Sequence, residues 1–324
     1  KPAKGTAYYL SLFFFFCGLL SKEMAITLPA VILLHDLTFG ALEGQALSAK
    51  GVLNTVKNRW PVYLGYVAVG LFYLALRFFI IIKPGDGIKP HFGDLFDRLL
   101  YLPNHIFSFI KLAFAPYDLN VEHVFSYPPT LFEFNHIAGF ILPFGLAIFS
   151  IILFKRFKEI FFGIWWLPIT LIPVYNLIQI FNPIAERYMY IPVIGFCLVV
   201  PVVIYSLFSR AFKRTVTANM ATLFVVLAIT AVYSNMTLAR NRDWKDGLTL
   251  WSKTVQQSPN SGVAHGSLAR AYQEQGMLDE AIAQYRMAVK LMPNHFKAYY
   301  NLAVVYAQKD DYTQAVDNLL TAIS

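Results

Sequence analysis

The chain has 324 residues, of which 57% are hydrophobic and 14% are charged, and its formal net charge is +8. A globule of this length needs more polar surface than this composition supplies, so a single water-soluble core is excluded. The Lys and Arg residues lie in short clusters between apolar runs, which argues against nucleic-acid binding and for helix ends that meet lipid headgroups. We therefore expect an all-α polytopic membrane protein.

The first apolar run covers residues 5–21, and the pair Lys22-Glu23 separates it from a second run over residues 24–35. The second run is short for a hydrocarbon core of about 30 Å. It is therefore either a tilted span or one arm of a re-entrant pair. In both cases the sequence predicts that Lys22-Glu23 lies near a membrane boundary.

A basic polar loop, residues 43–59, leads into a predicted span at residues 60–82. Residues 99–116 are apolar but contain Pro103 and Lys111, so they either span or dip into one leaflet. If they span, Lys22-Glu23 is cytoplasmic. If they are re-entrant, Lys22-Glu23 faces outside and the basic loop faces inside, which the positive-inside rule favours.

The clearest spans follow, at residues 137–154, 160–185, 188–209 and 215–239. The positive-inside rule predicts that the basic runs 155–158 and 210–214 are cytoplasmic, which leaves everything after Leu238 outside. Residues 1–239 are thus predicted to form one transmembrane helix bundle of about seven or eight membrane helices.

Residues 240–324 read as soluble helix with a repeat of 34 residues, as in the pairs Pro259 and Pro293 or Ala281 and Ala315. This period predicts tetratricopeptide helix pairs, here half a repeat plus two, in an α-solenoid that binds a protein or peptide. The predicted packing positions are Leu268, Tyr272, Ala281, Tyr285, Pro293, Leu302, Tyr306 and Ala315.

Charged residues at membrane depth are costly, so each is a candidate for function. Arg187, between Glu186 and Tyr188, would suit a phosphate because a guanidinium binds it bidentately. An interfacial anchor with a snorkelling Arg and a Tyr in the aromatic belt explains the same residues equally well. Lys22-Glu23 has the same two interpretations, a contact to a lipid-linked phosphate or a helix-end pair that sets topology.

Other ionisable residues give weaker signals. Asp36 and Arg77 lie near predicted helix ends and are interpreted as snorkelling residues. Arg98 and His105 flank the ambiguous segment and are candidates for lining a substrate cavity. The sequence has no P-loop, dinucleotide fingerprint or Cys/His metal spacing, so no cofactor or metal site is predicted, with a divalent cation left open.

Three motifs occur in order: LSKEMAITLPAVILLHD at 20–36, AERYMYIPVIGFC at 185–197, and RNRDWKD at 240–246 followed by the repeats. Together with Arg98-Leu-Leu and FAPYDL at 114–119, they resemble the transmembrane and tetratricopeptide repeat-containing O-mannosyltransferase family in its bacterial form. That family belongs to the GT-C class of membrane glycosyltransferases.

The resemblance implies transfer of a sugar from a polyprenyl-phosphate carrier to a protein Ser or Thr hydroxyl. It implies a bacterial inner membrane, with the repeats in the periplasm. Donor-phosphate binding would fall to Lys22, Glu23, Glu186 and Arg187, with Tyr188 and Arg98 beside them. The catalytic carboxylate of the GT-C class lies in its first external loop, so the general base is expected upstream of Lys1 and the chain is expected to be truncated at both ends.

Two other functions remain open. A ligase or polymerase of surface polysaccharide also uses polyprenyl carriers and external Arg residues, but transfers to a glycan. A non-catalytic membrane anchor that presents the repeats to a partner predicts that the membrane charges tolerate replacement while the repeat surface does not.

Overall fold

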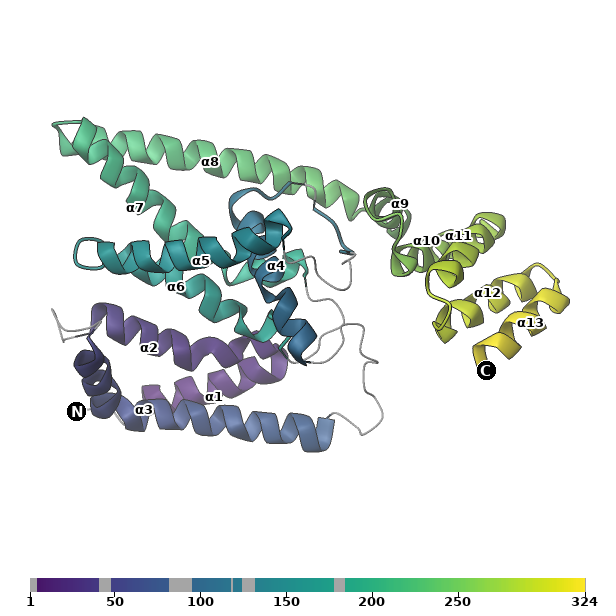
Figure 1. The fold of residues 1–324 in the computed structure, drawn as a ribbon, viewed down its shortest axis with the longest axis horizontal. Helices are drawn as coiled ribbons and strands as arrows, with labels where there is room; N and C mark the ends of the chain where they lie inside the picture. The colour runs from purple at the N-terminus through teal and green to yellow at the C-terminus, as the bar shows by residue number, and fades with distance from the viewer. Residues whose placement is uncertain are drawn as a thin grey trace. The chain divides into compact units, whose positions relative to one another are not determined.

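The computed structural model describes residues 5–40, 48–81, 95–117, 119–123, 132–177 and 184–323. Across these residues the regular structure is helical, with thirteen α-helices (Figure 1). The chain divides into two compact units, Lys1–Pro116 with Tyr127–Val226 and Tyr117–Ser126 with Leu227–Ser324. We call them the bundle unit and the repeat unit.

The bundle unit is built from the long apolar helices. They are α1 Thr6–Ser21, α2 Leu28–Phe39, α3 Ala49–Leu76, α4 Leu95–Phe114, α5 Phe134–Leu153, α6 Lys158–Leu171, α7 Val193–Ala211 and the first part of α8 Thr215–Asp243. Short 3₁₀ turns occupy Glu23–Thr27, Ile172–Val174 and Glu186–Tyr190, and a π-helical segment, Arg77–Ile81, continues α3.

Four helices in the described part of the chain are long and apolar enough to cross a membrane, namely α3 with its extension, α5, α7 and α8. The bundle also exposes large apolar side chains, such as Phe14 at 66%, Phe144 at 67% and Phe224 at 74%. Lipid solvates such a surface, whereas water does not. The chain therefore has the construction of a membrane protein, and the count of seven or eight membrane helices stays a prediction.

Helices α1 and α3 pack through both apolar and polar contacts. Phe15 and Leu19 of α1 are buried against Tyr66 and Tyr73 of α3. The Ser11 hydroxyl lies 2.8 Å from the Tyr66 hydroxyl. Lipid chains are as apolar as the helices, so hydrogen bonds of this kind help to fix helix pairs inside a membrane.

Asp36 joins α2 to α3. Its side chain is buried, its Oδ2 accepts a hydrogen bond of 2.7 Å from the Tyr63 hydroxyl, and its Oδ1 pairs with the Arg59 guanidinium. Asp36 is therefore held between two helices and does not extend towards solvent as its place near a helix end suggests.

Glycines allow close helix contacts in the bundle. A Cβ built on Gly195 of α7 would lie 2.4 Å from the carbonyl oxygen of Gly163 on α6, and one on Gly139 of α5 would lie 1.9 Å from the Pro103 carbonyl oxygen of α4. Small residues at such crossings let backbones approach, a common device in membrane helix pairs. Five described helices of the bundle unit have a proline in their interior, at Pro61, Pro103, Pro143, Pro168 and Pro201.

Two boundaries differ from the sequence prediction. Helix α6 ends at Leu171, well before the end of the predicted span 160–185, because Pro173 in the following turn cannot continue an α-helix. Residues 178–183 lie outside the described residues. Helix α3 begins at Ala49, inside the predicted loop 43–59, because the Ser48 hydroxyl caps it by accepting a 3.0 Å hydrogen bond from the Gly51 N–H.

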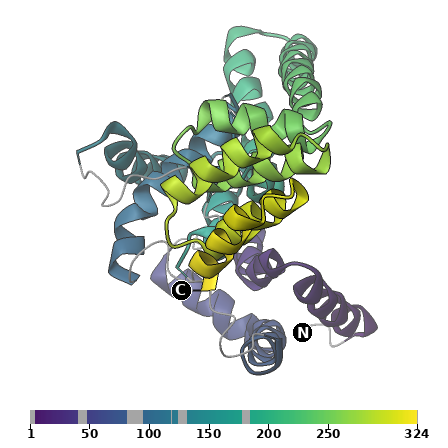
Figure 2. The ribbon, with the colours of Figure 1, turned by 90° about the vertical axis from the view of Figure 1, so that its right-hand side faces the viewer.

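The repeat unit continues from α8 with five shorter helices, α9 Gly247–Gln257, α10 Gly262–Glu274, α11 Leu278–Leu291, α12 Phe296–Gln308 and α13 Tyr312–Ile323 (Figure 2). Each helix packs on the next, and one apolar cluster that includes Tyr285, Leu302 and Tyr306 joins four of them, α10 to α13. The turns repeat as well, since Gly276 and Asp310, 34 residues apart, both have positive φ, at 75° and 62°.

Candidate functional site

The first charged motif forms the turn between α1 and α2. Lys22 has an extended backbone and breaks α1, and Glu23–Thr27 then winds as a 3₁₀ helix. The Thr27 hydroxyl closes this turn by donating 3.0 Å to the Met24 carbonyl oxygen. As a result Met24 points inward and is buried, while Lys22 is exposed and Glu23 is half-buried.

The second charged motif forms the turn that leads into α7. Ala185 is extended and buried, and Glu186–Tyr190 winds as a 3₁₀ helix that buries Met189. Arg187 is exposed, and its guanidinium carbon lies 5.1 Å from the centre of the Tyr188 ring. This stacking orients the guanidinium while leaving its N–H groups available to an anion.

Helix α6 holds the second turn in place. The Trp166 indole N–H donates a 2.9 Å hydrogen bond to the Ile191 carbonyl oxygen, directly after the turn. The close approach of Gly163 to Gly195 fixes the start of α7 one turn further on. The backbone around Arg187 is thus positioned by contacts that do not use the Arg187 side chain.

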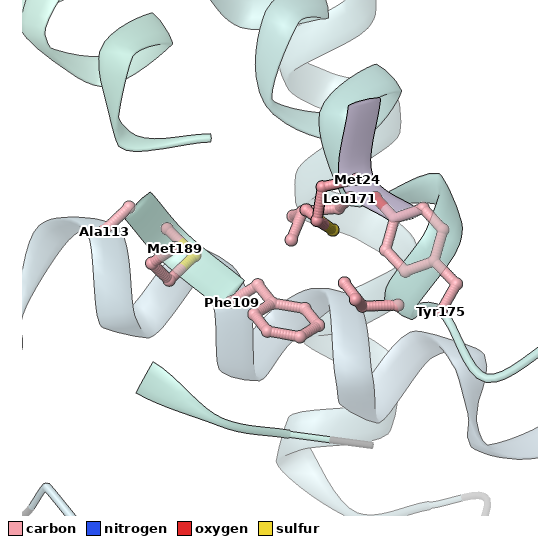
Figure 3. Packing of buried hydrophobic residues seen from close by; sticks show 7 residues of the cluster. Met24, Phe109, Ala113, Leu171, Tyr175 and Met189 are labelled. Atoms are coloured by element: carbon pink, nitrogen blue, oxygen red, sulfur yellow. The ribbon is translucent and has the colours of Figure 1, made fainter. Parts of the chain in front are cut away.

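The two turns meet at α4. Met24 from the first turn and Met189 from the second are buried in one cluster with Phe109 and Ala113 of α4 (Figure 3). Leu171 at the end of α6, with Val174 and Tyr175 just after it, completes the cluster, and Tyr188 packs against it. We call this group the junction cluster. It brings together the two charged motifs that lie far apart in the sequence.

Glu23 pairs with Arg77, which the sequence analysis interpreted as a snorkelling residue. Arg77, in the π-helical end of α3, places its Nη1 3.9 Å from a Glu23 carboxylate oxygen. The same Nη1 donates a 2.8 Å hydrogen bond to the Tyr73 hydroxyl. Arg77 therefore belongs to the site, and its charge inside an apolar run is the signal that could have identified it.

Arg98 is placed differently. It lies in the first turn of α4, where it is half-buried, and Phe109 follows eleven residues later. At 1.5 Å per residue this separates Arg98 from the junction cluster by roughly 16 Å along the helix axis. His105, one turn before Phe109, is fully buried and stacks on Tyr101 with ring centres 6.2 Å apart.

An apolar cavity of about 330 Å³ adjoins the junction cluster. Helices α4, α5, α6 and α7 line it, and Ile106, Leu167 and Tyr175 contribute both to its wall and to the cluster. Its lining is apolar almost throughout, which suits a hydrocarbon chain and not a sugar. The described residues contain no group of three or more His, Cys, Asp or Glu side chains that could hold a metal ion.

The predicted repeat positions fall into two groups. Leu268, Ala281, Tyr285, Leu302, Tyr306 and Ala315 are buried, and Tyr272 packs against their cluster. Pro293 is exposed in the turn between α11 and α12. Alanines at 281 and 315 lie where two helices touch, which explains why a small residue recurs there.

Comparison with known proteins begins with the repeats. Residues 269–310 match the family model described as TPR repeat. Over the wider chain, the mouse protein O-mannosyl-transferase TMTC1 is 29% identical across 267 residues, which is 76% of this chain and 27% of that protein. These similarities support the O-mannosyl-transferase family.

Other O-mannosyl-transferases match over shorter segments. The human protein O-mannosyl-transferase TMTC1 is 29% identical over 210 residues, covering 60% of this chain and 23% of its own length. The protein O-mannosyl-transferase tmtc2 of Xenopus laevis is 33% identical over 111 residues, covering 34% and 13%. The chain thus spans about a quarter of the length of the TMTC1 proteins it matches.

Proposed function

We propose that this chain carries the donor-binding part of a membrane glycosyltransferase, which moves a sugar from a polyprenyl-phosphate carrier to a protein Ser or Thr hydroxyl. One observation carries the proposal. The turns bearing Lys22 and Arg187 are anchored on the same junction cluster, and an apolar cavity adjoins that cluster. An ionic head and a hydrocarbon tail are what a lipid-linked sugar phosphate presents.

The headgroup contact rests on charge and exposure. Arg187 is exposed and held against Tyr188, and Lys22 is exposed at the end of α1. Cations positioned in this way would stabilise the phosphate as the sugar leaves it. Glu23 pairs with Arg77, so in our proposal these two residues fix the first turn.

The carrier chain would enter the cavity between α4 and α7. An isoprenoid is apolar along its whole length, and the cavity wall offers apolar and aromatic side chains from four helices. The proposed acceptor is a protein, because the TPR repeat is a module for protein–protein interaction. Transfer to a hydroxyl also needs a general base, and we assign that role to none of the described residues.

We further propose that the site faces the non-cytoplasmic side, in a bacterial inner membrane with the repeats in the periplasm. The links between α5 and α6 and between α7 and α8, which carry Lys155–Lys158 and Arg210–Arg214, lie at the end of the bundle opposite to α4 (Figure 1). The positive-inside rule makes that end cytoplasmic. Helix α4 is not among the four candidate spans, which favours the re-entrant interpretation of residues 99–116.

Arg187→Ala tests the proposal in the full-length membrane protein, reconstituted in nanodiscs. Two probes are titrated, a polyprenyl phosphate and the matching polyprenol. Loss of a charge-assisted contact should weaken polyprenyl-phosphate binding about 10- to 100-fold and leave polyprenol binding unchanged. Arg210→Ala, an Arg at the opposite end of the bundle, is the matched control and should bind both probes normally.

Ala147→Phe tests the tail half of the proposal, because Ala147 lines the cavity. A larger side chain there should weaken the binding of both probes by the same factor. Wild-type affinity for the phosphate probe in Arg187→Ala would refute the headgroup site. An equal loss of affinity for both probes in Arg187→Ala would make Arg187 a structural residue. Full glycosyl transfer in both variants would remove Arg187 and the cavity from the donor site, whereas no transfer by the wild-type protein would favour the non-catalytic anchor.

A further inference from the structure

A five-residue segment of the chain packs on the repeat unit far from its place in the sequence. Residues 119–123 follow α4, yet they cluster with α9–α13 and belong to the same compact unit. We call residues 119–123 the strap. Its contact partner is Ser258, at the C-terminal end of α9.

The strap and Ser258 form a closed hydrogen-bond circuit. The Asn120 Nδ2–H donates 2.7 Å to the Ser258 hydroxyl oxygen, and that hydroxyl donates 2.8 Å to the Glu122 backbone oxygen. The Asn120 Oδ1 in turn accepts a 3.2 Å hydrogen bond from the Glu122 N–H. Because every polar group in this circuit has a partner, burial of Asn120 and Ser258 carries no penalty for unmade bonds.

Both side chains of the circuit are removed from solvent, Asn120 at 7% and Ser258 at 8% exposure. The Ser258 backbone carbonyl oxygen also accepts from the Ser261 N–H at 3.0 Å, and the Ser261 hydroxyl caps α10 by accepting from the Ala264 N–H at 3.1 Å. The strap therefore touches the turn that sets how α10 follows α9.

A stack of repeats needs a cap at its first helix, since the outer face of that helix has no preceding repeat to cover it. We propose that the strap is the N-terminal cap of the repeat stack, which closes the turn between α9 and α10. This inference is independent of the proposed glycosyl transfer.

Hydrogen exchange on the full chain in nanodiscs tests the cap. Asn120→Ala and Ser258→Ala should each speed amide exchange at least tenfold in α9, and leave α12 and α13 unchanged. Asn120→Asp keeps the oxygen that accepts from Glu122 but lacks the N–H that reaches Ser258, so it should behave like Asn120→Ala. Ser252→Ala, on the same helix, is the matched control.

The double variant Asn120→Ala/Ser258→Ala decides whether the two residues act as one unit. Its exchange should equal that of either single variant, because each single change already opens the circuit. Additive effects would show that Asn120 and Ser258 act separately. Wild-type exchange in all variants would overturn the cap itself.

Discussion

Met24 and Met189 are buried in the same cluster, and each is the inward-facing residue of a short turn whose neighbours are charged. A flexible thioether fills an irregular gap well, so the two turns can share the surface of Phe109 without a fixed register between them. The pair of methionines is what makes one site from two distant motifs.

Phe109 is the centre of that arrangement and is fully buried. Phe109→Ala should lower the free energy of unfolding by about 3 kcal/mol through the cavity it leaves. It should also weaken polyprenyl-phosphate binding, since both turns lose their support. Thermal unfolding in detergent measures the first effect, and Phe224→Ala, an exposed Phe of α8, is the control. Loss of stability with unchanged binding would show that the turns hold their positions without Phe109.

The contact between α6 and α7 makes a sharp prediction about glycine. Gly195→Ala puts a methyl group 2.4 Å from the Gly163 carbonyl oxygen, so the helices must separate, at a cost of about 1–3 kcal/mol. Gly145→Ala on α5 meets nothing within 4 Å and should stabilise the helix by about 0.5–1 kcal/mol. Opposite shifts in melting temperature are expected. A neutral Gly195→Ala would mean that α7 can move away freely.

The two partners of the Asp36–Arg59 pair should differ in how much their removal lowers the free energy of unfolding. Arg59→Ala leaves a buried carboxylate with the Tyr63 hydroxyl as its remaining strong donor, and should destabilise by about 2–3 kcal/mol. Asp36→Asn leaves a guanidinium that is already half exposed, so its effect should be smaller. Chemical denaturation of both variants measures which is less stable. A larger loss of stability in Asp36→Asn would contradict the buried pair.

The strap should respond to pH through Glu122. Burial raises the pKa of the Glu122 carboxyl from 4.5 to about 7. The packed state therefore holds this proton more tightly than the unpacked state, and its advantage is lost as pH rises from about 4.5 to about 7. Because intrinsic amide exchange itself accelerates with pH, the quantity to compare is the protection factor of the α9 amides, which should fall across that window. Glu122→Gln should flatten the profile, and an unchanged profile in that variant would assign the pH dependence to another group.

Local signals predicted the helices and the repeats well. Long uncharged runs indicate α5, α7 and α8, and the 34-residue period indicates the helix pairs of the repeat unit, because both depend on neighbours in sequence. The early end of α6 and the early start of α3 had signals too, in Pro173 and Ser48. The predicted span limits followed averaged hydropathy instead, because an average over many residues does not register a single capping or helix-breaking residue.

The site itself depends on contacts that no local pattern carries. The sequence indicated Lys22 and Arg187 as candidates, but not that Met24 and Met189 would bring their turns to one cluster. The pairing of Arg77 with Glu23 was not predicted for a similar reason, because it joins the end of α3 to the turn after α1. The strap contact with Ser258 also joins distant segments, and only the fold reveals it.

Helix α8 is longer than a bilayer requires. Its 29 residues extend about 43 Å, against a hydrocarbon core of about 30 Å. Tilt or projecting turns take up the excess length, and Arg240 and Arg242 lie in the last turn of the helix. Arg side chains at such a helix end extend to the lipid headgroups, so the two residues would set the depth at which α8 sits in the bilayer.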